Sequence, residues 1–237
     1  MKNIVFLMFF FSSHIFAHSV IGVLRGKKEI LIKTKSQGEL KKINFKEGDL
    51  VKAGDVIAEI DNEKEKLELK MALNDFEQAK MDYKKSKKLK KYLSQDELLK
   101  KKNDYLKKEN LFKLKKYNLE AKNITSPIAG IVAKNYINEG ENISNGAKAF
   151  EVIQYNELVI DLYIQAKYSE KFKKGDYLTF QQETNKTEKY KGEVFFISPV
   201  LDKSSGTFHL KLRIKNSKDQ KGRHILKPGA MVKVFIE

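Results

Sequence analysis

The sequence contains no cysteine, and only four of its 237 residues are histidine. The lack of cysteine excludes disulfides, thiolate metal sites, cysteine nucleophiles and the lipidated cysteine of a bacterial lipoprotein. The histidines, His14, His18, His209 and His224, form no ligand-like pair, so we expect no metal site. None of them lies near a plausible nucleophile either, and we therefore expect no catalytic residues and no cofactor.

Long apolar runs are also lacking, except near the N-terminus. Residues 1–17 have the order of an export signal, with Lys2, an apolar run from Ile4 to Phe11, and Ala17 as a cleavage point. A retained membrane anchor is the alternative, but a spanning helix needs about 20 apolar residues, more than this run provides. We predict a signal peptide over residues 1–17 and a mature chain outside the cytoplasm.

Acidic residues are fewer than basic ones, 31 against 47, which gives a net charge of +16. Such an excess is compatible with nucleic acid, an anionic membrane or an acidic protein as partner. A nucleic-acid binder interleaves arginine and aromatic residues on one face, whereas here the excess is scattered lysine. We expect no nucleic-acid partner. The 33% of charged residues require much exposed surface, and an elongated shape satisfies this requirement.

An internal repeat, split by an insertion, is the most informative feature of the sequence. The first copy is GELKKINFKEGDLVKAGDVIAEI and the second is GIVAKNYINEGENISNGAKAFEV. A shift of 92 residues pairs Gly38 with Gly130, Glu47 with Glu139, Gly48 with Gly140, and Gly54 with Gly146. Each copy has the pattern of short strands joined by glycine turns. Because strands this short cannot bury a face alone, we predict one lipoyl-like sandwich from residues 34–61 and 124–156.

The insertion, residues 62–123, contains neither glycine nor proline and is rich in lysine, glutamate and leucine. This composition favours helix, and the segment carries 19 lysines and 11 acidic residues, a net charge of +8. Apolar residues recur at helical spacing in both halves, which predicts a coiled-coil hairpin with arms of about 45 Å. The predicted inward stripes are Leu69, Ala72, Phe76, Ala79 and Tyr83 in the first half, and Leu99, Leu106, Leu114, Tyr117, Ala121 and Ile124, with Asn103 and Asn110, in the second.

The reversal between the two arms is expected near Tyr92, Leu93 and Ser94. Ser94 precedes Asp96 and Glu97, the pattern of a helix N-cap followed by acidic residues in the first turn. Beyond the repeat, residues 157–237 alternate between strands and turn signals, which predicts a small antiparallel β-barrel. Residues 18–33 have no other partner and are expected to join this barrel as one more strand. The predicted fold class is thus mostly β, with one long helical hairpin.

These features together resemble the periplasmic adaptor family, also called membrane fusion proteins, of tripartite efflux pumps, and most of all the RND-type adaptors. The resemblance is carried by EGDLVKAGDVIAEID and TSPIAGIVAKNYINEGENISNG, by the helical insertion between them, and by KGEVFFISPVLDKSSGTFHLKLRIKN with LKPGAMVKVFI. It extends over nearly the whole chain after residue 17. It implies a non-catalytic adaptor in the periplasm that links an inner-membrane transporter, RND-type, to an outer-membrane channel.

The resemblance further implies a homo-oligomer, either a hexameric ring or a trimer of dimers, associated with the inner membrane through its transporter. Adaptors of this family dock on the channel with the hairpin tip, through a basic residue, a leucine and a serine. The matching partner-binding residues here are Lys88, Leu93 and Ser94, followed by Glu97 and Leu98. Upstream of Leu93 the segment is shorter than in the family, and lysine stands where arginine is usual.

The sequence also bears on functions of other kinds. A lipoyl or biotinyl carrier presents a modifiable lysine between its two halves, but here helices take that place, and Lys64 and Lys66 are expected on a helix surface. Two alternatives stay open. One is an adaptor of an ATP-driven (ABC-type) exporter, and the other is a free-standing envelope scaffold that binds its partners through the coiled coil.

Overall fold

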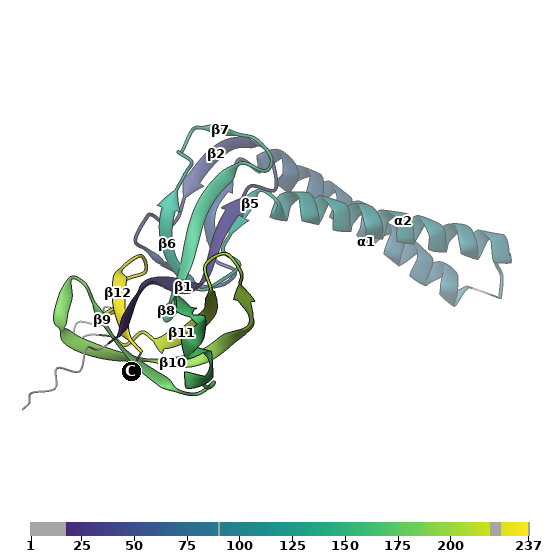
Figure 1. The fold of residues 1–237 in the computed structure, drawn as a ribbon. Coiled ribbons are helices and arrows are strands. Elements are labelled where there is room, and N and C mark those ends of the chain that lie inside the picture. The colour runs from purple at the N-terminus through teal and green to yellow at the C-terminus, as the bar shows by residue number, and fades with distance from the viewer. Residues whose placement is uncertain (1–17, 90, 219–223, 237) are drawn as a thin grey trace, which may run out of the picture. The chain divides into compact units, whose positions relative to one another are not determined.

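A computed structural model describes residues 18–89, 91–218 and 224–236 (Figure 1). The signal peptide expected over residues 1–17 lies outside these residues. The chain divides into two compact units, which we call the sandwich unit (residues 28–154) and the barrel unit (the chain up to Lys27 and from Tyr155 onward). Strands form the larger part of the regular structure, so the prediction of a mostly β fold is confirmed.

The sandwich unit contains two sheets of short strands. One has the order β5-β4-β2-β7, and the other contains β3, β6 and the first part of β8. The strands are β2 (Gly38–Ile43), β3 (Leu50–Val51), β4 (Val56–Ile60), β5 (Asn123–Thr125), β6 (Gly130–Asn135), β7 (Asn142–Ile143) and β8 (Lys148–Gln165). Leu40, Ile57, Ile60, Val132, Phe150 and Val152 fill the core between them. Ile32, near the end of β1 (Ser19–Lys33), joins this core, so β1 is not confined to the barrel unit.

The two copies of the repeat exchange backbone hydrogen bonds in matched pairs. Gly48 donates its N–H to the carbonyl of Val132 at 2.9 Å. The equivalent residue of the second copy, Gly140, donates to the carbonyl of Leu40 at 2.8 Å. Since each copy satisfies backbone groups of the other, the sandwich requires both of them.

The repeated glutamates make the same exchange with their side chains. The carboxylate of Glu47 accepts a hydrogen bond from the N–H of Asn135 at 2.7 Å. In the other direction, the carboxylate of Glu139 accepts from the N–H of Ile43 at 2.6 Å. The shift of 92 residues that relates the two glutamates also relates Ile43 to Asn135. The repeat is therefore a pseudo-symmetric pair of interlocked halves, and its glutamates have structural roles.

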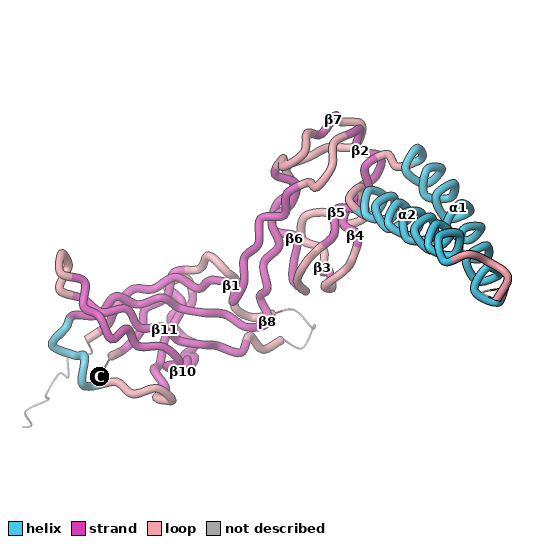
Figure 2. Tube along the Cα trace, turned by 90° about the vertical axis from the view of Figure 1, so that its right-hand side faces the viewer, coloured by secondary structure: helices cyan, strands magenta, loops and turns pink. Residues whose placement is uncertain are grey.

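Two helices are inserted between the halves, α1 (Glu63–Lys88) and α2 (Gln95–Glu120), and they pack against each other along their length (Figure 2). On α1 the inward stripe is the one predicted from spacing, since Ala72 and Ala79 are buried and Phe76 is half-buried. The Phe76 ring lies 5.5 Å from the ring of Phe112 and 5.7 Å from that of Tyr105. The small alanines leave room for these rings between the two backbones.

The stripe predicted for α2 is wrong over most of its length. Leu99, Leu106, Leu114 and Tyr117 are 40–63% exposed, and only the last members, Ala121 and Ile124, are buried. The residues that face α1 are instead Leu98, Tyr105, Phe112 and Leu119, which recur every seven positions and are half-buried. Two apolar series at helical spacing run along α2, and the one with Tyr105 and Phe112 lies against the aromatic rings of α1. The leucine series is left facing outward.

Ion pairs between the helices recur at the same interval of seven. We call this series the lysine ladder; it consists of Lys101–Asp82 (4.0 Å), Lys108–Asp75 (2.6 Å) and Lys115–Glu68 (2.7 Å). Each lysine follows an inward apolar residue of α2 by three positions. A shift of one helix along the other would separate every pair at once, so the ladder specifies the register of the two helices.

Lys122 closes the base of the helix pair. Its ammonium group lies 3.2 Å from the carboxylate of Glu65 and donates to the carbonyl of Gln37 at 3.0 Å. Its side chain is 12% exposed, which makes it more enclosed than the ladder lysines. One lysine thus joins α1, α2 and the loop before β2.

The barrel unit consists of the first part of β1, the second part of β8, a short 3₁₀ helix (Ala166–Lys171), β9 (Tyr177–Gln182), β10 (Asn185–Asp202), β11 (Thr207–Lys215) and β12 (Met231–Phe235). The strands follow the order β1-β12-β9-β10-β11-β8, and β1 also pairs with β8, which closes the ring. Closure leaves no free sheet edge in this ring. Leu162, Phe180, Phe208, Leu210, Leu212 and Val234 are among the fully buried side chains of its core.

The turn glycines of the repeat generate a stability prediction. Gly48, Gly54, Gly140 and Gly146 lie in turns with φ between 80° and 92°. A side chain on Gly146 would meet no other atom within 4 Å, so only the backbone conformation opposes it. Gly146→Val should lower the free energy of unfolding by at least about 1 kcal/mol, and Gly146→Asn by less, because asparagine tolerates positive φ. Urea denaturation followed by circular dichroism measures both, and equal midpoints for valine and glycine would contradict the assignment.

A second prediction tests the lysine ladder. Asp75→Lys places two ammonium groups where an ion pair now exists and should lower the melting temperature of the sandwich unit. Adding Lys108→Asp restores opposite charges and should recover most of the loss. Glu77→Lys is the control, since it makes the same change of charge at an exposed position of α1 outside the ladder. The ladder has no role in register if Asp75→Lys and Glu77→Lys have equal effects, or if the double variant melts like Asp75→Lys.

Candidate partner-binding site

The helix pair ends in a tight reversal, which we call the tip (residues 87–89 and 91–98). Helix α1 ends at Lys88, and the N–H of Leu89 donates to the carbonyls of Lys85 and Ser86, both at 3.1 Å. The N–H of Tyr92 then donates to the carbonyl of Leu89 at 2.8 Å. Backbone hydrogen bonds thus connect the end of α1 to the residues that follow it in the tip.

Ser94 begins α2, as its sequence context predicts. Its hydroxyl accepts from the N–H of Glu97 at 3.2 Å, and the Glu97 carboxylate accepts from the N–H of Ser94 at 3.0 Å. This reciprocal pair is a capping box, which satisfies backbone donors that the first turn of a helix leaves open. Hydrogen bonds from the backbone and the hydroxyl of Ser94 lower the pKa of the Glu97 carboxyl. Glu97 thus has a structural task at the tip, besides any contact with a partner.

The structure places all the predicted partner-binding residues in the tip, but they differ in exposure. Lys88, Ser94 and Glu97 are exposed within the reversal, and Leu93 is half-buried beside them. Leu98 is also half-buried, but it starts the inward series of α2, so its first role is packing against α1.

Tyr92 is the tip residue that sequence reasoning passed over as a binding residue. Its side chain is 86% exposed, the largest value among the exposed large hydrophobic residues of the described chain, and Leu89 beside it is 52% exposed. Two such side chains at the end of a helix pair are suited to enter pockets of a partner. The sequence does contain a signal for this role, because a tyrosine and two leucines stand within a run of lysines at the expected reversal.

Charges at the tip are arranged by helix end. Lys85, Lys87 and Lys88 lie in the last turn of α1, and Asp96 and Glu97 lie in the first turn of α2. Positive charges stabilise the C-terminal end of a helix and negative charges its N-terminal end, so both groups of residues stabilise the helix that carries them. The tip therefore offers a partner apolar side chains with a basic edge on one side and an acidic edge on the other.

A second candidate surface lies along the outward faces of the two helices. We call these faces the outer stripes: Leu67, Met71 and Met81 on α1, and Leu99, Leu106, Leu114 and Tyr117 on α2, all 40–70% exposed. Amides at the same spacing, Asn74 and Gln78 on one helix and Asn103 and Asn110 on the other, interrupt both stripes. Exposed apolar rows of this length on paired helices are typical of faces that pack against further helices.

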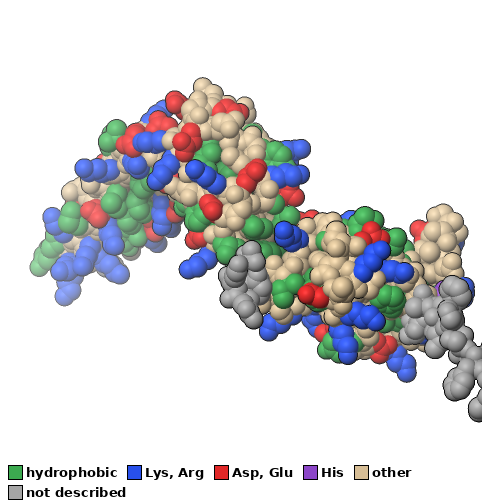
Figure 3. Space-filling view, turned by 90° about the vertical axis from the view of Figure 1, so that its left-hand side faces the viewer, with side chains coloured by type: hydrophobic (Ala, Val, Ile, Leu, Met, Phe, Trp, Pro, Cys, Tyr) green, Lys and Arg blue, Asp and Glu red, His purple; other side chains and the backbone are tan. Residues whose placement is uncertain are grey.

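Other kinds of site find little support in the described residues. No group of three or more histidine, aspartate or glutamate side chains there could hold a metal ion. On the face drawn in Figure 3, lysine and arginine side chains are spread over the molecule with acidic ones among them, and several lie close together at the free end of the helix pair. None of the helices in the described ranges combines the length and the apolar character that crossing a membrane requires.

Comparison with known protein families gives a match over the sandwich unit. The family described as RND MFP, barrel-sandwich hybrid domain, matches residues 28–155, more than half of the chain. Among curated proteins, the multidrug resistance protein MdtA of Cronobacter turicensis is 28% identical over 223 residues, which cover 84% of this chain and 54% of that protein. MdtA of Yersinia pestis is 27% identical over 227 residues, covering 84% and 51%. The chain thus spans about half the length of the curated relatives it matches.

Solved structures show the same fold. A chimeric MacA–MexA protein that contains the α-hairpin domain of Pseudomonas aeruginosa MexA has a TM-score of 0.78 at 20% identity, over 93% of this chain and 82% of the chimera. The membrane fusion protein Spr0693 from Streptococcus pneumoniae R6 has a TM-score of 0.70 at 14% identity, over 92% and 97%. At these identities the likeness concerns the fold alone.

Proposed function

The chain belongs to the family of RND membrane fusion proteins with a barrel-sandwich hybrid domain, and from this premise we propose that it is a periplasmic adaptor of a tripartite efflux system. In this role it links an inner-membrane transporter of the RND class to an outer-membrane channel and has no catalytic activity of its own. The observation that carries the proposal is the helix pair inserted between two interlocked halves, with an exposed tip.

We propose that α1 and α2 act as a coiled-coil hairpin that reaches the channel. Each helix has 26 residues, which corresponds to about 39 Å at 1.5 Å per residue. The lysine ladder and the Lys122 contacts support this role, because they hold the hairpin in one register and attach it to the sandwich. Tyr92 and Leu89 are the apolar contacts that the tip offers, and Lys88, Leu93 and Ser94 complete the docking surface.

The proposed location is the periplasm, in association with the inner membrane through the transporter. The export signal expected in residues 1–17 supports it, together with the family. The same proposal includes a division of the chain at residues 33/34, 61/62, 123/124 and 156/157. These boundaries separate the strand segment, the first lipoyl-like half, the hairpin, the second lipoyl-like half and the barrel.

Copies of the chain are proposed to associate through the outer stripes. The α1 stripe and the α2 stripe belong to different helices, so contact between α1 of one copy and α2 of the next is a head-to-tail interface. Such an interface closes into a ring when the rotation between copies permits it. A hexamer or a trimer of dimers satisfies this condition.

Docking at the tip can be tested with Tyr92→Asp. The side chain is almost fully exposed, so the variant should fold normally, while the added carboxylate should reduce recovery of the channel about tenfold or more after crosslinking and co-purification. Leu50→Asp is the matched control, because it places the same charge on a 62% exposed apolar residue of the same unit. Equal recovery with both variants would move the docking site elsewhere. If the wild-type chain recovers neither a transporter nor a channel, the adaptor proposal itself fails.

Self-association can be tested with one variant on each stripe, Met71→Asp on α1 and Leu106→Asp on α2. Sedimentation velocity should show that each variant alone loses the assemblies of the wild-type chain. A mixture should form dimers only, since the intact stripe of one variant meets the intact stripe of the other. An interface between two α2 stripes would leave Met71→Asp unaffected, and this result would exclude the head-to-tail arrangement.

A further inference from the structure

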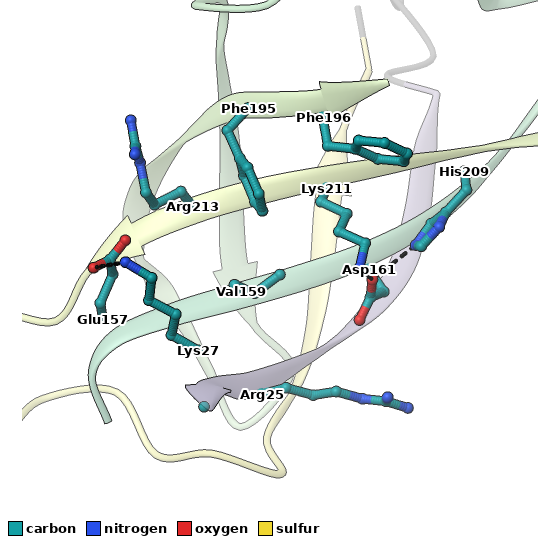
Figure 4. A pocket seen from close by; sticks show the side chains of 11 residues that line it. Arg25, Lys27, Glu157, Val159, Asp161, Phe195, Phe196, His209, Lys211 and Arg213 are labelled. Carbon is teal, nitrogen blue, oxygen red and sulfur yellow. Dashed lines mark hydrogen bonds and ion pairs between the residues drawn. The ribbon is translucent and has the colours of Figure 1, made fainter. Parts of the chain in front are cut away.

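The outer wall of the barrel carries a groove of about 650 Å³ that is formed by β1, β8, β10 and β11 (Figure 4). All of its lining residues belong to the barrel unit. Val159, Phe195 and Phe196 form the apolar part of the lining, and Phe195 points from β10 toward Val159. Since outward positions of a soluble barrel are usually polar, an apolar floor on the outside suggests a ligand.

A β-bulge creates this floor. Val194 of β10 pairs with Leu212, yet the next paired residue, Phe196, lies opposite Lys211, so Phe195 is the extra residue. Val194 is fully buried in the barrel core, and both phenylalanines that follow it line the outer groove. In a regular strand, two successive side chains would point to opposite faces. Bulges that re-aim a side chain are frequent next to functional sites.

Cationic side chains flank the aromatic rings. The guanidinium of Arg213 lies 6.0 Å from the ring centre of Phe195, and the ammonium of Lys211 lies 5.9 Å from that of Phe196. Both cations are also paired with acids, Arg213 with Glu193 at 2.9 Å and Lys211 with Asp161 at 3.5 Å. The cation–ring contacts hold the two rings in place, and each of the two cations already has an acidic partner.

Arg25 differs from the other basic residues of the groove. Lys27, two positions along β1, forms an ion pair with Glu157 at 2.9 Å. The guanidinium of Arg25, at the edge of the groove, has no acidic partner among the described residues (Figure 4). One uncompensated cation thus lies at the β1 side of a groove whose opposite side holds two aromatic rings, with Val159 between them (Figure 4).

We propose that this groove binds an amphiphilic anion, a hydrocarbon body with a single carboxylate, sulfate or phosphodiester group. The hydrocarbon rests on Phe195, Phe196 and Val159, where it removes apolar surface from water. The anionic group pairs with Arg25, whose planar donors match a carboxylate or sulfate in a bidentate manner. Neither part of the site depends on the adaptor role.

Titration calorimetry of the intact protein with dodecanoate, below its micelle concentration, tests the proposal. We expect saturable binding at one site, and about tenfold weaker binding for Arg25→Gln and for Phe195→Ser. Both residues are exposed, and circular dichroism verifies that the variants fold. Lys233→Gln, which removes a positive charge from an exposed position of β12 outside the groove, is the matched control and should bind like the wild type.

The sign of the ligand and its source are separated by two further measurements. Dodecyltrimethylammonium, with the same chain and the opposite charge, should not compete. Vesicles containing phosphatidylglycerol distinguish a lipid from a free amphiphile: sedimentation of the wild-type chain but not of Arg25→Gln with them identifies a lipid, and binding of free dodecanoate alone identifies a dissolved anion. The proposal is overturned if dodecanoate shows no saturable binding, if Arg25→Gln binds as tightly as Lys233→Gln, or if the cationic amphiphile binds equally well.

Discussion

The exchange of hydrogen bonds between the two halves of the repeat is the constraint on which the sandwich unit depends. Gly48 needs the carbonyl of Val132, Gly140 needs that of Leu40, and the two glutamates cap backbone donors of the opposite half. Neither half can satisfy these groups alone. The segment inserted between the halves therefore has to begin and end at neighbouring places in the sandwich, where β4 and β5 pair with each other. The sandwich therefore constrains the distance between the two ends of the inserted segment and leaves the rest of its design to the segment itself.

The helix pair meets this condition through its own interface. Its stability depends on aromatic rings of one helix that lie against rings of the other, and its register depends on ion pairs that recur with the rings. Exposed ion pairs of this kind add little stability individually, but a ladder favours the correct alignment, because a shift by a few residues separates all three pairs and a shift by seven loses one of them. At the base of the helix pair, Lys122 contacts both Glu65 of α1 and the carbonyl of Gln37 before β2, and it thereby fixes the helices to the sandwich. The turn at the other end is closed by local backbone bonds and a capping box, so the tip is shaped independently of the sandwich.

Features that depend on residues close together in the chain could be predicted from the sequence. The choice between two competing apolar faces of one helix could not. The α1 stripe, the cap at Ser94 and the glycine turns each depend on residues close together in the chain, where spacing and backbone preference decide. The inward face of α2 was misread because two apolar series compete there, and the true one contains lysines at every second inward position. From sequence alone, a lysine predicts a surface position, because the sequence does not show its acidic partner on the other helix. The bulge at Phe195 was equally hidden, since only the pairing of β10 with β11 shows that two successive residues share one face.

The interval of seven in the lysine ladder also limits how the reach of this protein can change in evolution. Seven residues are almost two full helical turns, so adding seven to each helix keeps rings, ion pairs and outward faces in phase. Any other insertion turns the tip about the helix axis by 100° for each residue or breaks the ladder above it. The length of the spacer is thus quantised in steps of about 10 Å. Longer arms can therefore arise by duplication of whole heptads in both helices together, whereas an insertion of one residue in one helix disrupts the pairing.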